Sequence, residues 1–256
     1  MNFIVTCEKV WKTYHHRIPV GIKELIVKGG DRPRNQFARI WALREVSFDV
    51  ARGQSLGIIG RNGTGKSTLL SLLLGTILPD KGRIEVDGRI APLLEIGAGF
   101  HPDLTGKENV FLYGCILGMT IYDIKQRYDR IVDFSDLRDV IDNPIRTYSN
   151  GMIARLGFST IIHAPVDLIL IDEVLAVGDN VFQEKCLKFF RNFTQQNGSL
   201  VIVSHDMETI KNICDEAIYL DNGLVVAKGK PTDVVERYRN DPANSDSAGA
   251  SLIAQI

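Results

Sequence analysis

The run GRNGTGKST at residues 60–68 constrains the fold of this chain more than any other stretch. It satisfies the pattern G-x-x-x-x-G-K-[ST], follows the apolar run QSLGIIG, and precedes the helix-compatible run LLSLLLG. Its three glycines let backbone N–H groups turn inward around phosphate oxygens, while Lys66 adds a positive charge and the Ser67 hydroxyl is a ligand for Mg²⁺. We therefore predict a buried strand, a phosphate-binding loop and a helix in direct succession.

Two further runs place polar side chains at the ends of expected strands. DLILIDE ends in Asp172 and Glu173, and VIVSHD contains His205. Because ligands bind outside the carboxyl ends of the strands in open α/β sheets, we expect all three side chains near the phosphate loop. Asp172 would hold Mg²⁺, Glu173 would orient or deprotonate an attacking water, and His205 would donate a hydrogen bond to a γ-phosphate. The pattern predicts an enzyme that binds and hydrolyses a nucleoside triphosphate.

Hydrophobic periodicity divides the chain into two kinds of structure. Short apolar runs at 54–60, 166–171, 200–203 and 217–220 alternate with helix-like stretches, which predicts an α/β core with a parallel sheet. Between about residues 91 and 165 we instead predict a mainly helical subdomain inserted into that core. One helix face there is formed by residues at helical spacing: Ile121, Ile124, Tyr128, Ile131 and Val132.

Composition excludes several functional classes. A formal net charge of −1 argues against a general nucleic-acid binder, which needs a basic excess. No stretch approaches the roughly 20 apolar residues that cross a bilayer, and no signal peptide is visible, so we expect a soluble chain. Four cysteines lie far apart without metal-ligand spacing, which predicts buried, reduced thiols in a cytosolic protein. They are Cys7, Cys115, Cys186 and Cys214.

A second helix start lies at TYSNGM, residues 147–152. Ser149, Asn150 and Gly151 supply capping and small residues ahead of an apolar helix. The first N–H groups of a helix are unpaired and favour an anion, yet no lysine follows to anchor a phosphate. From these residues alone, two interpretations stay open: an ordinary capped helix, or a second anion-binding turn.

The ordered set GRNGTGKST, YSNGM, LILIDE, Asp179 and SHD resembles the ATP-binding cassette family, the ATPase subunits of ABC transporters, over roughly residues 1–235. The resemblance implies a P-loop NTPase (RecA-like) α/β core with a parallel sheet, an antiparallel β edge and the inserted helical subdomain, all within one domain of residues 1–240. It further implies a head-to-tail homodimer, in which each ATP lies between one phosphate loop and the partner's Ser149–Gly151 turn. Such a turn needs no lysine, because the other chain supplies it.

The resemblance also implies roles for single residues. Tyr14 resembles the aromatic residue that stacks on adenine, with Trp11 as its competitor, and Asp179 resembles the aspartate of a loop that crosses the dimer interface. Where the family usually has a glutamine that contacts Mg²⁺, this chain has none, and Glu95 is the nearest polar candidate. The implied cofactors are ATP and Mg²⁺. The implied metal ligands are Ser67, Asp172 and Glu95, the catalytic residues are Lys66, Glu173 and His205, and the nucleotide-binding residues are Tyr14, Gly60, Arg61, Asn62, Gly63, Thr64, Gly65, Lys66, Ser67, Thr68, Ser149, Asn150, Gly151 and Asp179.

Longer stretches indicate which group within the family the chain resembles. WALREVSFDVARGQSLGIIGRNGTGKSTLL, LLEIGAGFHPDLTGKENVFLYGCILGM and YSNGMIARLGFS together resemble the cassettes of bacterial polysaccharide exporters for O-antigen, capsule and teichoic acid. This implies an ATPase that drives export of a lipid-linked polysaccharide. It would bind an integral-membrane permease at the cytoplasmic face of the bacterial inner membrane, as a peripheral protein without direct sugar or nucleic-acid contact. Alternatives are an ABC transporter ATPase for another cargo and a soluble, non-transport ABC ATPase.

Two segments lie outside this plan. Residues 15–40 form a basic insertion with six Lys/Arg against Glu24 and Asp31, and we expect either a contact with lipid or permease or a solvated loop. From Asp241 onward the composition predicts a poorly ordered tail. Because the chain stops at Ile256, we expect it to lack the carbohydrate-binding β-sandwich that some polysaccharide exporters add.

Overall fold

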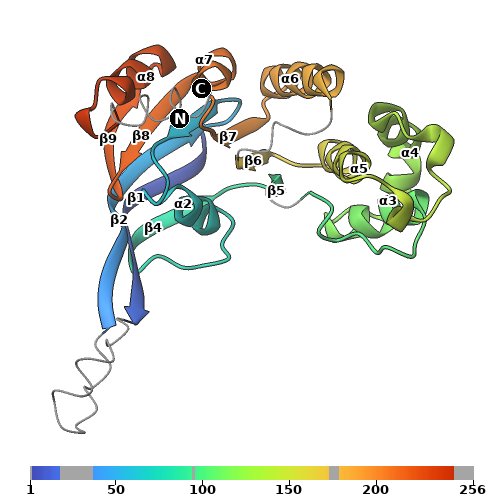
Figure 1. The fold of residues 1–256 in the computed structure, drawn as a ribbon, viewed down its shortest axis with the longest axis horizontal. Helices are drawn as coiled ribbons and strands as arrows, with labels where there is room; N and C mark the ends of the chain where they lie inside the picture. Colours follow the sequence, from blue (N-terminus) through green and yellow to red (C-terminus); the bar gives the residue numbers. More distant parts are fainter. Residues whose placement is uncertain (1, 18–36, 94–95, 173–178, 245–256) are drawn as a thin grey trace, which may run out of the picture.

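The computed structural model describes residues 2–17, 37–93, 96–172 and 179–244, which form two β-sheets and the helices around them (Figure 1). The strands are β1 (Phe3–Arg17), β2 (Phe37–Ala51), β3 (Ser55–Ile59), β4 (Lys81–Val86), β5 (Ile90–Leu93), β6 (Leu168–Asp172), β7 (Ser199–Val203), β8 (Glu216–Asp221) and β9 (Leu224–Gly229). The helices are α2 (Lys66–Leu73), α3 (Gly106–Ile116), α4 (Ile121–Ser135), α5 (Asn150–Ile162), α6 (Asn180–Gln195), α7 (Met207–Ile213) and α8 (Pro231–Arg239), with 3-10 turns at Arg138–Val140 and Ile145–Thr147.

The larger sheet contains all the predicted apolar runs. Its strand order is β5-β6-β7-β3-β8-β9; neighbours from β5 to β8 pair parallel and β9 pairs antiparallel with β8. The smaller sheet, β2-β1-β4, is antiparallel. The predicted α/β fold with a parallel sheet and an antiparallel β edge is confirmed.

Alternation along the central strands gives the sheet two apolar faces. In β6, Ile169 and Ile171 belong to a core shared with α5, α6, α7 and α8, whereas Leu168 and Leu170 belong to a core shared with α2 and the smaller sheet. Burial on both faces explains why these strands are continuous apolar runs. Each fully buried aliphatic side chain contributes roughly 1.5–3 kcal/mol, so the strands and their loop ends are held firmly.

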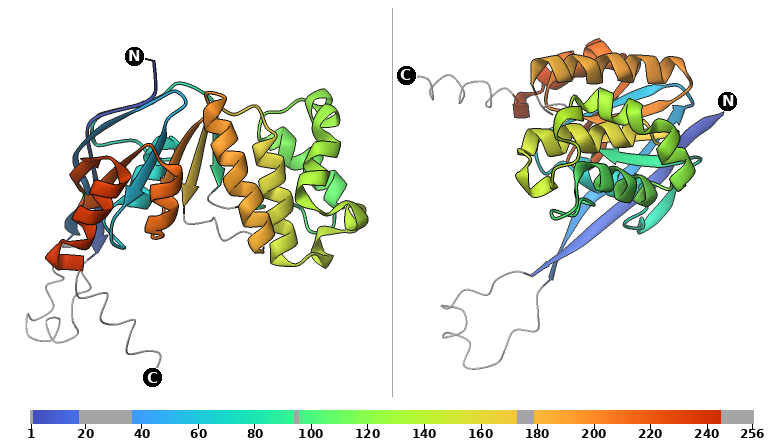
Figure 2. Two further views of the ribbon diagram at one scale, coloured as in Figure 1. Left: turned by 90° about the horizontal axis from the view of Figure 1, so that it is seen from above. Right: turned by 90° about the vertical axis from the view of Figure 1, so that its right-hand side faces the viewer.

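Helices α3, α4 and α5 form a separate group at one end of the molecule, drawn in green and yellow in Figure 2. They have their own apolar core, which includes Ile124, Ile131 and Val132 of the predicted helix face. Thr120 begins α4 with a capping box, in which it exchanges hydrogen bonds with Asp123. Ile121 is 49% exposed, so the apolar face of α4 begins one turn later than predicted.

Strand β5 places the start of the helical region a few residues after the predicted boundary near residue 91. Ala91 and Leu93 pair with Ile169 and Ile171 of β6, which places Ile90–Leu93 in the parallel sheet. Pro92 interrupts the apolar pattern and cannot donate to a ladder, so proline is tolerated only at sheet edges. β5 is such an edge strand.

The β1–β2 hairpin corrects the predicted insertion at residues 15–40. Both strands continue into that segment, since His15 pairs with Arg39 and Arg17 pairs with Phe37. Figure 1 shows this hairpin extending beyond the rest of the two sheets. The predicted contact of the insertion with a membrane or permease falls mostly on residues 18–36, which lie outside the described residues.

Burial separates the cysteines into two groups. Three are buried, and burial raises the pKa of each of their thiols to about 12, which keeps them protonated. Cys115 is exposed on α3, which corrects the expectation that all four are buried. Across the described parts of the chain, no helix combines the length and hydropathy needed to cross a membrane.

Candidate nucleotide-binding site

The phosphate loop connects β3 to α2, as predicted. Gly60, Gly63 and Gly65 all have positive φ, at 157°, 80° and 107°. A Cβ on Gly60 would lie 2.2 Å from the Leu220 carbonyl oxygen, and a Cβ on Gly65 would lie 2.4 Å from that of Ala42. Glycine is therefore required at both ends of the loop by conformation and by space.

Lys66 lies inside the loop rather than in solvent. Its side chain is 6% exposed, and Nζ donates hydrogen bonds to the carbonyl oxygens of Gly60 at 2.7 Å and Arg61 at 2.8 Å. Thr64 Oγ1 also donates to the Arg61 carbonyl, at 2.8 Å. The curved loop thus places a positive charge next to the N-terminus of α2, where helix N–H groups attract anions.

A cavity of about 370 Å³ opens above this loop. Its lining includes Asn62, Gly63 and Lys66 from the loop, Ser67 from α2, and Asp172 from the end of β6. A hydroxyl and a carboxylate on one cavity wall are oxygen ligands of the kind that Mg²⁺ takes together with substrate phosphates. The residues present fit the predicted metal, which Ser67 and Asp172 would ligate.

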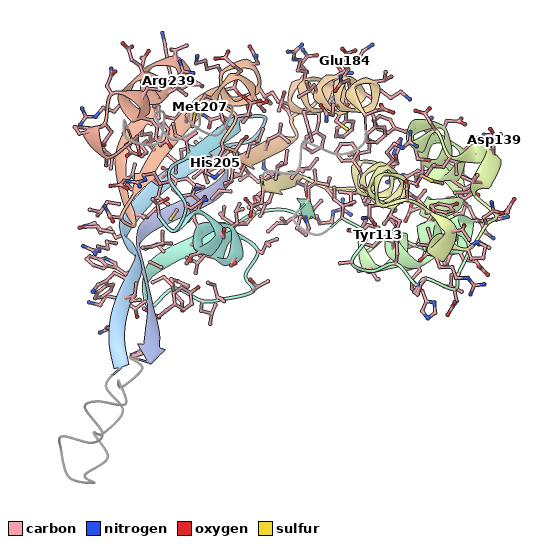
Figure 3. The ribbon with its side chains drawn as sticks, in the orientation of Figure 1. Tyr113, Asp139, Glu184, His205, Met207 and Arg239 are labelled. Atoms are coloured by element: carbon pink, nitrogen blue, oxygen red, sulfur yellow. The ribbon has the colours of Figure 1, made fainter. Side chains whose placement is uncertain are left out.

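His205 reaches the same edge of the sheet. It follows β7, as Figure 3 shows. Its Nε2 lies 3.0 Å from Oδ1 of Asn62 in the phosphate loop. The next residue, Asp206, caps α7 by accepting hydrogen bonds from Glu208 N and Thr209 Oγ1. The hydrogen bond from Thr209 lowers the pKa of the Asp206 carboxyl. This ionised cap fixes the backbone beside His205.

An aromatic wall from the β1–β2 hairpin completes the cavity. Tyr14 lines it and is 44% exposed, whereas Trp11 packs edge-on against Trp41 with ring centroids 5.1 Å apart and lies outside the lining. Sequence reasoning missed Ile40 and Trp41, which both line the cavity. The signal for Ile40 is the strand register, in which it pairs with Tyr14, whereas Trp41 pairs with Thr13. Cross-strand pairing therefore places Ile40 beside the predicted aromatic, and Trp41 is its neighbour in sequence.

The Ser149–Gly151 turn is a helix cap in the described structure. Ser149 Oγ accepts a hydrogen bond from Met152 N at 3.2 Å, and Ser149 N donates to Met152 Sδ at 3.5 Å. Asn150 is the first residue of α5. None of these residues lines the cavity above the phosphate loop, so one chain does not bring its two anion-ready turns together.

The remaining predicted residues differ in what the structure says of them. Asp179 caps α6, since its Oδ1 accepts a hydrogen bond from Phe182 N at 2.9 Å. Arg61 directs its guanidinium to the carbonyl oxygen of Ala243 at 2.6 Å. Glu173 and Glu95 lie outside the described residues, so their predicted roles stay predictions.

A glycine-rich phosphate loop lies between a parallel strand and a helix, with the Ser67 hydroxyl and the Asp172 carboxylate on the same cavity wall. This arrangement defines a P-loop nucleotide-binding protein. A family model described as "ABC transporter" matches residues 43–176. The chain belongs to this family, and it therefore carries an ATP-binding cassette that hydrolyses ATP.

Three individual similarities extend over much of the chain. The O-antigen export system ATP-binding protein RfbB of Klebsiella pneumoniae is 42% identical over 93% of this chain and 98% of its own length. The teichoic acids export ATP-binding protein TagH of Lactococcus lactis is 42% identical over 77% of this chain and 42% of its own length. A solved dimeric ATP-binding cassette, bound to ADP and phosphate after hydrolysis, matches with a TM-score of 0.69 and 21% identity over 89% of this chain and 98% of its own. This last similarity supports the fold.

The aromatic wall predicts which side chain holds the adenine. Tyr14→Ala should weaken ATP binding by about tenfold, since stacking of an aromatic side chain on a base contributes roughly 1–3 kcal/mol. Trp11→Ala should have a smaller effect, because Trp11 reaches the cavity only through Trp41. ATP titration monitored by tryptophan fluorescence or calorimetry checks this, with Tyr14→Phe as the matched control. Equal losses in the two alanine variants would count against Tyr14.

Proposed function

We propose that this chain is the ATP-hydrolysing subunit of an ABC transporter that exports a lipid-linked polysaccharide of the O-antigen, capsule or teichoic-acid type. The observation that carries the cargo assignment is 42% identity to an O-antigen export ATP-binding protein over 98% of that protein's length. A teichoic-acid export protein shares the same cassette region. An ABC ATPase for another cargo is the second candidate, and only these similarities decide between the two.

The cavity residues have different roles in ATP hydrolysis. The loop N–H groups and the N-terminus of α2 hold the phosphates, and Lys66 exchanges its two carbonyl acceptors for β- and γ-phosphate oxygens. Ser67 and Asp172 would hold Mg²⁺, which would neutralise phosphate charge. His205 leaves Asn62 and donates to the γ-phosphate, while Glu173 takes the proton of the attacking water. Lys66 and His205 already have partners in the loop, so nucleotide binding exchanges hydrogen bonds instead of creating them all anew.

Glu173→Gln tests both the enzymatic role and the cargo. The variant should bind ATP normally and hydrolyse it about 10²–10⁴-fold more slowly, the range for a lost general base. In a strain with this variant as its only copy, surface glycan should disappear while lipid-linked glycan accumulates inside. Glu184→Gln, on the exposed surface of α6, is the matched control. Normal surface glycan with stably expressed Glu173→Gln protein would remove the export assignment.

We also propose that two copies pair head to tail around ATP. One chain keeps its Ser149–Gly151 turn away from its own phosphate loop, so a second copy is needed to bring the two halves together. Gly151 supports this arrangement, since a Cβ there would meet only Ser149 Oγ, at 3.9 Å. The space in front of the turn is open and can receive a phosphate from the partner's site.

Heterodimers with separately tagged chains test the pairing. One carrying Lys66→Ala in one chain and Gly151→Asp in the other should retain activity, because both lesions then fall in the same composite site and the second site is intact. The matched control places both lesions in one chain beside a wild-type chain, so that each site carries one lesion. ATPase activity of the two purified heterodimers is compared. Equal activity would contradict the head-to-tail arrangement.

The partner in the membrane would be an integral-membrane permease, with this chain at the cytoplasmic face of the bacterial inner membrane. Exposed apolar side chains support a docking surface on the helical subdomain: Leu112 and Ile116 lie one turn apart on α3, and Ile121 and Tyr122 begin α4. Apolar side chains gathered at the surface mark interaction sites. We call these four residues the α3–α4 surface.

Charge placed on the α3–α4 surface should break permease binding without affecting ATP. The double variant Ile116→Asp, Tyr122→Asp should lose co-purification with the permease while its affinity for ATP stays within twofold. Leu78→Asp is the matched control, because Leu78 is also exposed but lies near the smaller sheet. Pull-down of the detergent-solubilised permease gives the measurement. Unchanged recovery would place the permease contact elsewhere.

A further inference from the structure

The residues that follow α8 return to the phosphate loop. Arg61, the second residue of the loop, donates a hydrogen bond from Nη1 to the carbonyl oxygen of Ala243 at 2.6 Å, across 182 positions of sequence. The sequence predicted a poorly ordered tail from Asp241 onward, and the ordered residues 241–244 correct the start of that tail. The remainder, 245–256, lies outside the described residues.

Hydrogen bonds with strand β8 hold the Ala243 carbonyl in place. Asn244 is only 7% exposed, and its Nδ2 donates to Tyr238 O at 2.8 Å and to the Tyr219 hydroxyl at 3.1 Å. Tyr219, fully buried on β8, donates its hydroxyl to Asp241 Oδ2 at 3.2 Å. Asp241 Oδ1 in turn accepts from Ala243 N at 3.0 Å. We name residues 241–244 with Tyr219 the C-terminal clasp.

The clasp and the phosphate loop rest on the same strand. Leu220 directly follows Tyr219, and its carbonyl oxygen is the atom that a Cβ on Gly60 would strike at 2.2 Å. The turn after β8 also contacts the loop, since Gly223 N donates to the Thr64 carbonyl at 3.1 Å. Strand β8 and the turn after it therefore contact both the phosphate loop and the clasp.

Both the side chain and the backbone carbonyl of Arg61 form hydrogen bonds. Its side chain is held by Ala243, and its own carbonyl accepts hydrogen bonds from Lys66 Nζ and Thr64 Oγ1, each at 2.8 Å. The hydrogen bond to Ala243 therefore restrains the residue whose carbonyl oxygen anchors the phosphate-binding lysine. This links the C-terminal clasp to the conformation of the loop.

We propose that Arg61 is a positioning residue and that the C-terminal clasp pre-forms the phosphate loop for ATP. A loop already held in its binding shape loses less conformational freedom when the nucleotide arrives. The guanidinium is committed to Ala243 and contacts no reacting atom, so its effect is on binding alone. Its loss should raise the Kd and KM for ATP together and leave kcat unchanged. The proposal rests on ATP being the ligand of the loop.

Thermodynamic linkage makes the coupling between the clasp and ATP binding reciprocal. If the clasp strengthens ATP binding, then ATP must stabilise the clasp by the same factor. The backbone N–H groups of Ala243 and Asn244 both bond to Asp241, so their hydrogen exchange reports whether the clasp is closed. MgATP should slow exchange in residues 241–244 of the wild-type chain and should not do so in Arg61→Ala.

The test compares Arg61→Ala, Asn244→Ala and the double variant by steady-state ATPase kinetics and direct ATP binding. Each single variant should raise KM and Kd about 2- to 10-fold, the range of one hydrogen bond, with kcat within twofold of wild type. The double variant should be no worse than the weaker-binding single variant, because both break one clasp. Arg52→Ala is the matched control, since Arg52 donates to the Asp87 carbonyl at 2.6 Å, outside the phosphate loop. Tyr219→Phe replaces Asn244→Ala if the latter melts below the assay temperature.

The proposal would be overturned by unchanged ATP affinity in Arg61→Ala, by additive effects in the double variant, or by an equal rise of KM in Arg52→Ala. A fall in kcat at unchanged KM would also overturn it, since that result assigns Arg61 to the chemical step. Wild-type protein that fails to bind ATP at all would instead contradict the proposed function. The two failures are therefore distinguishable.

Discussion

The phosphate loop passes within contact distance of two other backbones, and this close approach determines where the nucleotide site forms. The carbonyl oxygens of Leu220 and Ala42 occupy the space that side chains on Gly60 and Gly65 would need. Leu220 belongs to the parallel sheet and Ala42 to the smaller antiparallel sheet. The loop is thus held between the two sheets. The hairpin lines the cavity beside the loop because β2 supplies both Ala42 and its neighbours Ile40 and Trp41.

The larger sheet, which is apolar on both faces, positions the other polar side chains of the site. Asp172 at the end of β6 and His205 after β7 reach the loop because their strands run parallel to β3 and are buried on both faces. Strands held this way cannot slip by one residue without exchanging their two apolar faces. Register therefore fixes the distance between His205 and Asn62 in the loop.

Local patterns predicted the features that local physics determines. The glycine loop, the strand ends and the cap at Ser149 all follow from spacing of a few residues, and the structure shows the loop, the cap and the ends of β6 and β7 where they were expected. Strand β5 was missed because Pro92 removes the strand signal, which only pairing with β6 restores. Ile40 was missed because it reaches the cavity through its cross-strand pairing with Tyr14, and Trp41 adjoins it in sequence. The clasp was missed because a polar composition says nothing of a buried Asn244 held by a tyrosine 25 residues away.

The two interpretations of the Ser149–Gly151 turn are compatible in the structure. The Ser149 hydroxyl takes one N–H group of the first turn of α5, that of Met152. Asn150 and Gly151 are the first two residues of α5, so their N–H groups have no acceptor within the helix, and a Cβ on Gly151 would meet only Ser149 Oγ, at 3.9 Å. A cap therefore orders the helix end without filling it. In the proposed head-to-tail pair, the serine that caps the helix would also pre-form a site for a phosphate held by the other chain, because an ordered turn loses little freedom on binding.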